Sequence, residues 1–255
     1  MTLRFASLGS GSRGNAMLVE SSSTLIMVDC GLTLKAVEAR LQALGRHPAD
    51  IDALLVTHEH ADHIQGVGRF VRRHGTPVWM THGTASSAAG RALADVNAFG
   101  FRHSLKIGSF DVQPFPVPHD AREPAQFVFR CGGRKLGILT DTGHVTAHIT
   151  ERLAHCDALA VECNHDLDRL WGGAYPQPLK ARVASPLGHL NNAQAAGLLE
   201  AVGHAELQWV IALHLSENNN TPALVYESLA GQLKRPSQSL HVASQDEPSR
   251  WMPID

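Results

Sequence analysis

The chain has 255 residues, of which 44% are hydrophobic and 18% are charged. This composition supplies enough apolar material for a folded core and excludes a largely disordered chain. Lys and Arg number 22 against 24 Asp and Glu, for a formal net charge of -2, so any contact with nucleic acid must come from a local basic patch.

The expected elements alternate between strands and helices. Strands are predicted where short apolar or alternating runs lie between turn residues, and helices where apolar residues recur at helical spacing. In chain order they are strands 3–8, 16–20 and 24–28, helix 34–44, strand 51–56, helix 63–73, strand 77–80, helix 81–93, strands 110–117, 126–131, 135–140 and 158–163, helix 191–202, strand 209–213 and helix 222–233.

Turn signals among these elements indicate the fold class. Gly132 and Gly133 predict a hairpin, and the two prolines of segment 110–117 suit an edge strand better than a sheet centre. A purely parallel sheet would not contain such tight hairpins, so the pattern favours an α/β fold of mixed sheets with outer helices. We expect one domain over residues 1–235, followed by a surface tail or edge strand over 236–255.

Histidine is the unusual component, with 16 residues, and three of them fall in the segment 57–63, Thr-His-Glu-His-Ala-Asp-His. The segment follows a buried strand and precedes a helix. His58 and His60 are two positions apart, so an extended backbone directs both to one side, and Asp62 and His63 follow where the helix begins. Imidazole and carboxylate together are ligands for Zn, Mn or Fe. The alternative is a His-rich surface loop in which Asp62 caps the helix.

Three further strands end at a possible ligand. His119 follows the strand 110–117, Asp141 follows 135–140, and His214 follows 209–213. The carboxyl ends of strands in α/β sheets are where functional loops converge. A single buried histidine is more often a hydrogen-bonded core residue, but the agreement of four strand ends favours metal ligation.

These motifs resemble, in their order, the metal-binding motifs of the metallo-β-lactamase superfamily, over about residues 3–233. The resemblance implies a four-layer αβ/βα sandwich with a two-metal site at one edge. It also implies a role for each residue that matches a family motif. By position, His58, His60 and His119 would hold one metal, Asp62, His63 and His214 the other, Asp141 would bridge them, and Asp29 would orient ligands without binding metal.

Finer motifs at 7–15, 162–166, 188–192 and 214–219 are similar to the YycJ/WalJ-type branch, which is related to PhnP-like phosphodiesterases and more distantly to RNase Z. This resemblance implies a metal-dependent hydrolase of phosphodiester bonds, of the 5′-to-3′ DNA exonuclease type, with Mn favoured. β-Lactamases usually have cysteine at the position of Asp141, which argues against lactam hydrolysis.

The implied chemistry uses two divalent ions, Zn, Mn or Fe, about 3.5–4 Å apart, which share a bridging water and lower its pKa so that hydroxide attacks phosphorus. Asp141 would hold the two ions together, Asp62 would bind metal and accept a proton, and His189 would protonate the leaving group. A structural hydrogen bond is the alternative for His189. The substrate-binding candidates are His165, Asn164 and Arg13.

Two other motifs favour ordinary interpretations. Residues 9–14 match GxGxxG with Asp29 at the dinucleotide-binding distance, but a short strand rather than a helix follows, so we reject nucleotide-cofactor binding. The basic stretch 69–74 is typical of a solvated helix face, with a nucleic-acid backbone patch as the alternative. Trp171 and Tyr175 lie in a segment expected to be a loop.

The remaining alternatives concern substrate and location. A small-molecule cyclic phosphodiesterase, a thioester hydrolase of glyoxalase II type, mononuclear-iron oxygen chemistry and a non-catalytic metal-binding protein stay open, as do the native metal and the oligomeric state. We expect a phosphodiester substrate that includes DNA. The four cysteines form no close pair, the N-terminus lacks a signal-peptide pattern, and no apolar run approaches the roughly 20 residues of a membrane helix, so we expect a cytoplasmic protein without a membrane partner.

Overall fold

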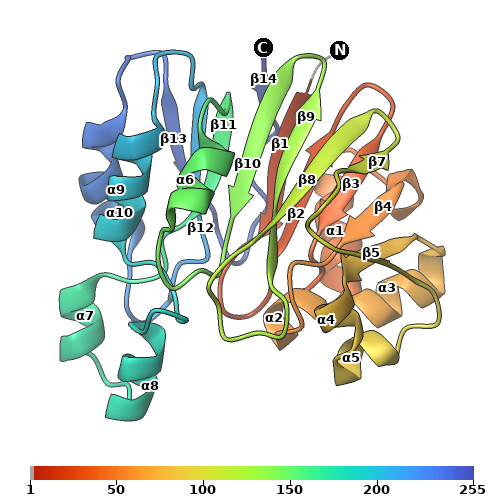
Figure 1. Ribbon diagram of the computed structural model, residues 1–255, viewed down its shortest axis with the longest axis horizontal. Helices are drawn as coiled ribbons and strands as arrows, with labels where there is room; N and C mark the ends of the chain where they lie inside the picture. Colours follow the sequence, from red (N-terminus) through yellow and green to blue (C-terminus); the bar gives the residue numbers. More distant parts are fainter. Residues whose placement is uncertain (1–2) are drawn as a thin grey trace. The chain divides into compact units, whose positions relative to one another are not determined.

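The computed structural model describes residues 3–255 (Figure 1). Its strands form two mixed seven-stranded sheets, with strand orders β14-β1-β2-β3-β4-β5-β6 and β13-β12-β11-β10-β9-β8-β7. The chain divides into two compact units. Unit 1 comprises the described residues up to Pro116 together with Ala121–Arg134 and Ser244–Asp255, and unit 2 comprises Val117–Asp120 and Lys135–Ala243.

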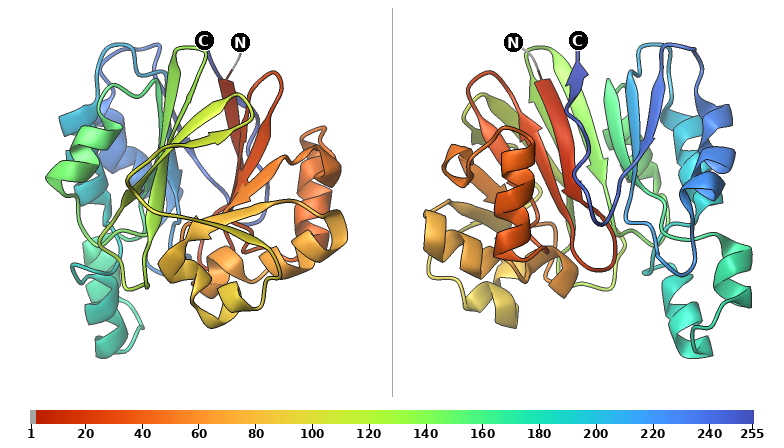
Figure 2. Two further views of the ribbon diagram at one scale, coloured as in Figure 1. Left: turned by 45° about the vertical axis from the view of Figure 1, so that its right-hand side comes forward. Right: turned by 180° about the vertical axis from the view of Figure 1, so that it is seen from behind.

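Unit 1 contains the whole first sheet. Its strands are β1 (Leu3–Gly9), β2 (Ala16–Glu20), β3 (Leu25–Val28), β4 (Ala53–Leu55), β5 (Val78–Thr81), β6 (Val96–Phe99) and β14 (Met252–Ile254). Strands β14, β1, β2 and β3 pair antiparallel, whereas β3 to β6 pair parallel. The second view in Figure 2 shows β14 beside β1 at the edge of this sheet. Unit 1 also holds β7 (Leu105–Ile107), β8 (Phe110–Pro116) and β9 (Ala125–Cys131).

The helices of unit 1 bury an apolar face against the first sheet. They are α1 (Leu34–Ala43), η1 (Pro48–Asp50), α2 (Ala61–Ile64), α3 (Val67–His74), α4 (His82–Ala85) and α5 (Ala88–Arg91). Val37 and Leu41 of α1 and Phe70 of α3 are fully buried in one core with Met27 and Leu54 of the strands. Full burial of each such side chain contributes about 1.5–3 kcal/mol, and this packing holds the helix-bearing loops in place.

The helix predicted over 63–73 is wrong as a single element, because it is two helices, α2 and α3. In one continuous helix the Gly66 amide would donate to Asp62 O, but both groups take other partners here. The Gly66 amide donates to Cys30 O at 2.8 Å, and Asp62 O accepts from the Asn15 amide at 2.8 Å. Helical periodicity shows the buried face but not this exchange of backbone partners.

The helix predicted over 81–93 also divides, into the single-turn helices α4 and α5. Thr81 caps the first by accepting from the Thr84 amide, and Ser87 caps the second by accepting from the Gly90 amide. A serine inside the segment that caps a new helix also marks the end of the helix before it. The strands β6 and β7 were not predicted, since both are short and each carries exposed residues.

Strand β8 is an edge strand along only half of its length. Its first residues, Phe110–Val112, pair with β7, whereas the following residues pair with β9 alone. Pro114 and Pro116 lie in that second half. No strand of the described chain pairs with its outer side there, so the N–H that proline lacks is not needed by a neighbouring strand. The edge expected from the prolines is therefore correct for 113–116 and wrong for 110–112.

Unit 2 carries parallel strands. They are β10 (Arg134–Leu139), β11 (Ala158–Glu162), β12 (Trp209–Leu213) and β13 (Ser239–Val242). The helices are α6 (Ala147–Leu153), α7 (Leu167–Gly172), α8 (Gln177–Val183), α9 (Asn192–Val202), α10 (Pro222–Leu229) and η2 (Ala230–Gln232). Figure 2 shows α6, α9 and α10 gathered on one face of these strands. Thr221 caps α10 by accepting from the Leu224 amide, as the Thr-Pro start predicts.

The remaining segments differ in how well they match the sequence-based predictions. The segment around Trp171 is the helix α7 rather than a loop. The residues 236–255 supply two strands, β13 and β14, at the ends of the two sheets. Gly132 and Gly133 have φ of 58° and 81° in the turn after β9, which glycine adopts without strain. None of the helices described within 3–255 has the length and apolarity needed to cross a membrane.

Candidate metal centre

Two candidate ligands and the carboxylate expected to orient ligands lie where strands end, as the sequence predicts. Asp29 follows β3, Asp141 follows β10 and His214 follows β12. These three side chains also share an uncommon backbone, with φ of 60°, 46° and 57°. Left-handed conformations cost non-glycine residues about 1–3 kcal/mol and concentrate at functional sites. The chain thus bears strain at the positions where donors are presented.

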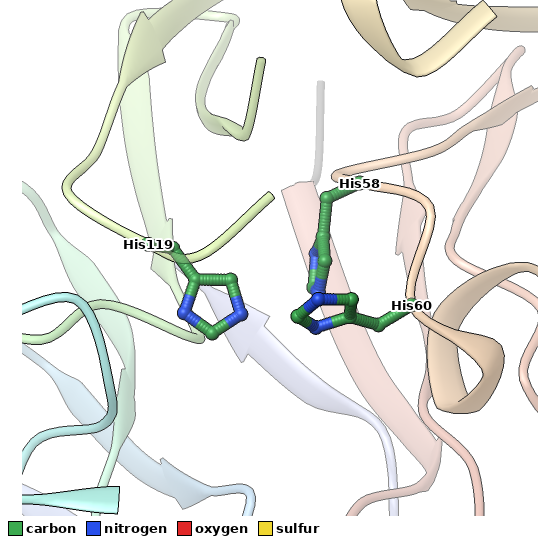
Figure 3. A group of neighbouring side chains, drawn as sticks. All are labelled: His58, His60 and His119. Carbon is green, nitrogen blue, oxygen red and sulfur yellow. The ribbon is translucent and has the colours of Figure 1, made fainter. Parts of the chain in front are cut away.

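In unit 1 the loop after β4 gathers three imidazoles. The ring centroids of His58 and His60, both drawn in Figure 3, are 4.5 Å apart. Those of His58 and His63 are 4.3 Å apart. His58 and His63 are fully buried, and Asp62 is partly exposed beside His63, with its Oδ2 3.5 Å from Nε2. The close placement expected from the HxHxDH spacing is therefore present within this unit.

Asp29 fixes the orientation of two of these histidines. Its Oδ2 accepts from His63 Nδ1 at 2.7 Å, which leaves the His63 Nε2 lone pair for a metal. The Thr57 hydroxyl donates to the same carboxylate at 2.9 Å and lies 3.0 Å from His58 Nδ1, from which it accepts. One buried carboxylate therefore sets the tautomers of His63 directly and of His58 through Thr57.

The glycine-rich loop over residues 9–15 contacts the start of α2. The Asn15 amide donates to Asp62 O at 2.8 Å, and the Asn15 side-chain nitrogen lies 3.2 Å from His63 Nε2 and 3.4 Å from Asp62 Oδ2. Gly31 allows this approach, since a Cβ there would lie 1.6 Å from Asp62 O. Sequence reasoning missed Asn15. The feature of the sequence that indicates such a contact is the glycine-rich loop, because its glycines permit another segment of backbone to approach closely.

In unit 2 the donors surround Asp141. Its Oδ1 lies 3.5 Å from His214 Nε2 and 4.0 Å from His119 Nε2. His119, the third side chain drawn in Figure 3, donates from Nδ1 to Gly188 O at 3.0 Å, so its Nε2 carries the lone pair. The Asp141 carboxylate is 1% exposed, and the Thr140 hydroxyl donates to it at 2.6 Å.

Glu162, at the end of β11, is a buried carboxylate beside the candidate donors to which sequence reasoning gave no role. It is fully buried and accepts from the Thr142 and Leu190 amides, each at 3.0 Å. Its Oε1 lies 2.6 Å from His189 Nδ1 and 3.5 Å from His214 Nδ1. A lone glutamate after an apolar run has no spacing signature, so only the fold shows that it orients two histidines.

The electrostatics of Glu162 and His189 follow from this pairing. Burial alone would raise the pKa of Glu162, but the charge and hydrogen bond of His189 hold it low, at about 2. Burial likewise lowers the pKa of His189, and the Glu162 carboxylate outweighs it, so the net shift is upward. His189 is partly exposed and stacks on His214 with centroids 5.2 Å apart. The predicted proton donor thus lies next to the metal-binding candidates.

The predicted substrate contacts Asn164 and His165 are buried. Asn164 Nδ2 donates to His214 O at 3.0 Å and lies 3.1 Å from His214 Nδ1. His165 is 1% exposed, its Nδ1 lies 3.3 Å from Asn164 Oδ1, and burial lowers its pKa to about 4. These contacts favour a role for both residues in positioning His214. Arg13, in contrast, is exposed in unit 1 and pairs with Asp246 at 2.8 Å.

The donor chemistry fits a divalent metal. In unit 2, Asp141, Glu162, His189 and His214 each offer a ligand atom, and these atoms lie within 4.8 Å of one another. Unit 1 supplies imidazoles oriented by a carboxylate. Neutral imidazole with carboxylate suits Zn, Mn or Fe, whereas thiolate is absent from both donor sets, and the four cysteines lie buried elsewhere as free thiols.

Mixed sheets with histidine and carboxylate donors at strand ends are typical of the metallo-β-lactamase fold. A solved metallo-β-lactamase fold protein, YhfI from Bacillus subtilis, superposes with a TM-score of 0.74 at 15% identity, covering 98% of this chain and 99% of its own. A diphosphatase of the PhnP family matches with a TM-score of 0.70 at 16% identity, covering 100% and 99%. At such identities these matches show the fold alone, and they confirm the predicted fold class.

The family is shown by sequence. The model of the β-lactamase superfamily domain matches residues 24–214. Exodeoxyribonuclease WalJ of Streptococcus pneumoniae is 33% identical over 237 residues, covering 90% of this chain and 88% of the relative. Exodeoxyribonuclease YycJ of Bacillus anthracis is 34% identical over 238 residues, covering 92% and 90%. The chain belongs to the metallo-β-lactamase superfamily, which confirms the resemblance found in its motifs.

Proposed function

We propose that the protein is a metal-dependent nuclease that removes nucleotides from DNA in the 5′-to-3′ direction. The observation that carries this proposal is the 33% identity to exodeoxyribonuclease WalJ across 90% of the chain. The buried imidazoles and carboxylates at the strand ends support it, because they suit a divalent metal and phosphodiester hydrolysis needs the charge that such metals supply.

The proposed ligand set has seven members. His58, His60 and His119 would hold one ion, Asp62, His63 and His214 a second, and Asp141 would bridge the two. When bound, the pair of divalent ions, Zn, Mn or Fe, would neutralise phosphoryl charge and activate water. The number and identity of the ions are part of the proposal.

The residues of the chain would divide the remaining work. Asp29 holds the His63 imidazole in the tautomer that presents a lone pair, and Glu162 pairs with His189. Asp62 is proposed to accept a proton from the attacking water. His189 is proposed to give a proton to the leaving alkoxide, because Glu162 favours its charged form and its ring remains partly accessible. Asn164 and His165 would act through His214.

We propose a single metallo-β-lactamase-like domain over residues 1–235, with residues 236–255 supplying edge strands of the same domain. The four cysteines of the chain are all free thiols, which suits a reducing compartment, and we propose a cytoplasmic location on this ground. Arg13 stays a candidate phosphate contact, although it would first have to leave Asp246.

The test uses the purified protein loaded with Mn or Zn and a 5′-phosphorylated DNA duplex labelled at its 3′ end. A 2′,3′-cyclic nucleotide and an aryl phosphodiester are assayed in parallel. Progressive shortening of the labelled strand is expected, with loss of the reaction in EDTA and in Asp141→Ala. Asp168→Ala, which removes an exposed carboxylate of α7, is the matched control and should keep full activity.

Other outcomes would replace the proposal. Cleavage of the small esters alone would identify a small-molecule phosphodiesterase. Full activity in Asp141→Ala would refute the bridging ligand. No cleavage of any of the three substrates by the metal-loaded protein would point to thioester hydrolysis or to a non-catalytic metal-binding role.

A further inference from the structure

A groove of about 370 Å³ lies in unit 1 beside the metal-binding loop. It is bounded by the start of α1, by α2 and α3, and by α5. Ile64 and Gln65, which line it, directly follow Asp62 and His63 in the chain. The groove therefore begins one residue beyond the candidate ligands of α2, and its volume falls in the range of about 300–1,000 Å³ typical of ligand sites.

The groove combines an apolar floor with a cationic rim. Leu32, Leu34, Ile64 and Leu93 line it together with small alanine and glycine residues, and Arg69 and Arg72 stand at its edge. The lining, drawn entirely from residues 32–93, contains no Asp or Glu. Neither α1 nor α3 has an acidic residue in its first turn, so no anion there offsets the positive charge.

The arginines of α3 differ in what they contact. Arg73 lies 3.6 Å from Glu38, and His74 Nε2 lies 3.0 Å from the same carboxylate. Arg69 and Arg72, on the side of the groove, form no ion pair within the described part of the chain and are exposed. The basic stretch thus has one neutralised face and one face whose charge is uncompensated.

We propose that this groove holds the DNA strand next to the bond that is cut, with Arg69 and Arg72 contacting backbone phosphates and the apolar floor packing against sugar and base. The inference rests on the proposed nuclease function and names a binding site for its substrate. A nucleic acid suits the groove better than an acidic peptide, because it presents a phosphate beside a flat apolar surface in each repeat unit.

The test measures DNA binding in EDTA, where no turnover occurs. A fluorescein-labelled 12-nucleotide single strand is titrated with the wild-type protein, with Arg69→Ala/Arg72→Ala, and with Arg73→Ala. Arg73→Ala is the control on the same helix, because it removes one positive charge away from the groove, and each single variant, Arg69→Ala or Arg72→Ala, matches it in charge. The double variant is expected to bind roughly tenfold more weakly and to lower the slope of log K against log salt by about 1 to 2.

A second readout uses the metal-loaded enzyme. The double variant should raise the KM for DNA while kcat/KM for a small aryl phosphodiester stays at the wild-type value, because the small ester does not reach the groove. Thermal unfolding of each variant checks that the fold is retained. A charge reversal, Arg69→Glu/Arg72→Glu, should weaken DNA binding further than the alanine pair.

The outcomes separate this inference from the proposed function. If Arg69→Ala/Arg72→Ala and Arg73→Ala bind DNA with equal affinity and equal salt slope, the groove is not the DNA-binding site, even if the wild type degrades DNA. DNA binding that depends on Arg69 and Arg72 in a protein that cleaves no DNA would overturn the nuclease and keep the groove. Preferential binding of a polyglutamate peptide of equal charge, with the same arginine dependence, would identify an acidic protein partner and refute a nucleic-acid site.

Discussion

The substitution Asp29→Asn tests how a carboxylate outside the ligand set controls metal binding. The Asp29 oxygens accept from Thr57 N at 2.8 Å, from the Thr57 hydroxyl at 2.9 Å and from His63 Nδ1 at 2.7 Å. Asparagine keeps the shape and tolerates the left-handed backbone at φ 60°, so the backbone strain is unchanged. It offers one acceptor oxygen in place of two.

The amide nitrogen of the new asparagine must therefore face a donor. If it takes the place of Oδ1, the Thr57 amide N–H loses its acceptor, while the Thr57 hydroxyl keeps its bond to the remaining oxygen. If it faces His63, the imidazole must move its proton to Nε2, and the lone pair is no longer presented to the metal. Either arrangement removes a charge-assisted hydrogen bond, each of which contributes about 1.5–3 kcal/mol.

Two measurements follow from these contacts. Urea unfolding in EDTA should show a loss of about 2 kcal/mol in the free energy of unfolding. Competition with a chromophoric chelator should show metal affinity lowered by about 10- to 100-fold, the range for residues that orient ligating histidines. The control is Asp52→Asn, whose carboxylate accepts from the Leu25 amide at 2.8 Å away from the donors. Metal affinity in Asp29→Asn equal to that in Asp52→Asn would refute the reasoning.

Three further predictions follow from other contacts. His189→Ala should lower kcat by about 100-fold or more while bound metal, measured by elemental analysis, stays near normal, and loss of metal would make His189 a ligand. Gly31→Ala should destabilise the fold by more than about 2 kcal/mol in urea unfolding, since a Cβ there would lie 1.6 Å from Asp62 O, and a wild-type midpoint would contradict that contact. Burial raises the pKa of the Cys30 thiol to about 12, with the nearby Asp29 charge adding to the shift, and it raises that of Cys163 as well. Both thiols should therefore resist alkylation at pH 8 until urea unfolds the protein, and rapid labelling of either one in the native state would show that it is exposed.

The sequence predicts those parts of the site that depend on local spacing. The HxHxDH segment and the residues after β8, β10 and β12 are visible because a strand directs its last side chains in a regular way. Glu162 and Asn15 are not visible, since each acts through a contact made by a distant part of the chain. Glu162 meets His189 across 27 positions, and Asn15 meets His63 across 48.

The same distinction holds for the fold. The apolar runs of β1, β2, β11 and β12 predict strands because burial and period agree. The division between α2 and α3 escapes prediction, because it depends on the Gly66 amide turning to Cys30 O. Elements fixed by their own periodicity are predictable, and elements fixed by a partner elsewhere in the chain are not.

The left-handed backbone at Asp29, Asp141 and His214 has a consequence for how this chain can evolve. Glycine at any of the three would relieve strain of about 1–3 kcal/mol, yet it would remove a carboxylate or an imidazole from the site. At Asp29 the relief would be offset, because glycine would also remove the hydrogen bonds to Thr57 and His63. The strain is therefore held in place by the contacts of the side chain itself, and a substitution that removes the strain also removes what stabilises it.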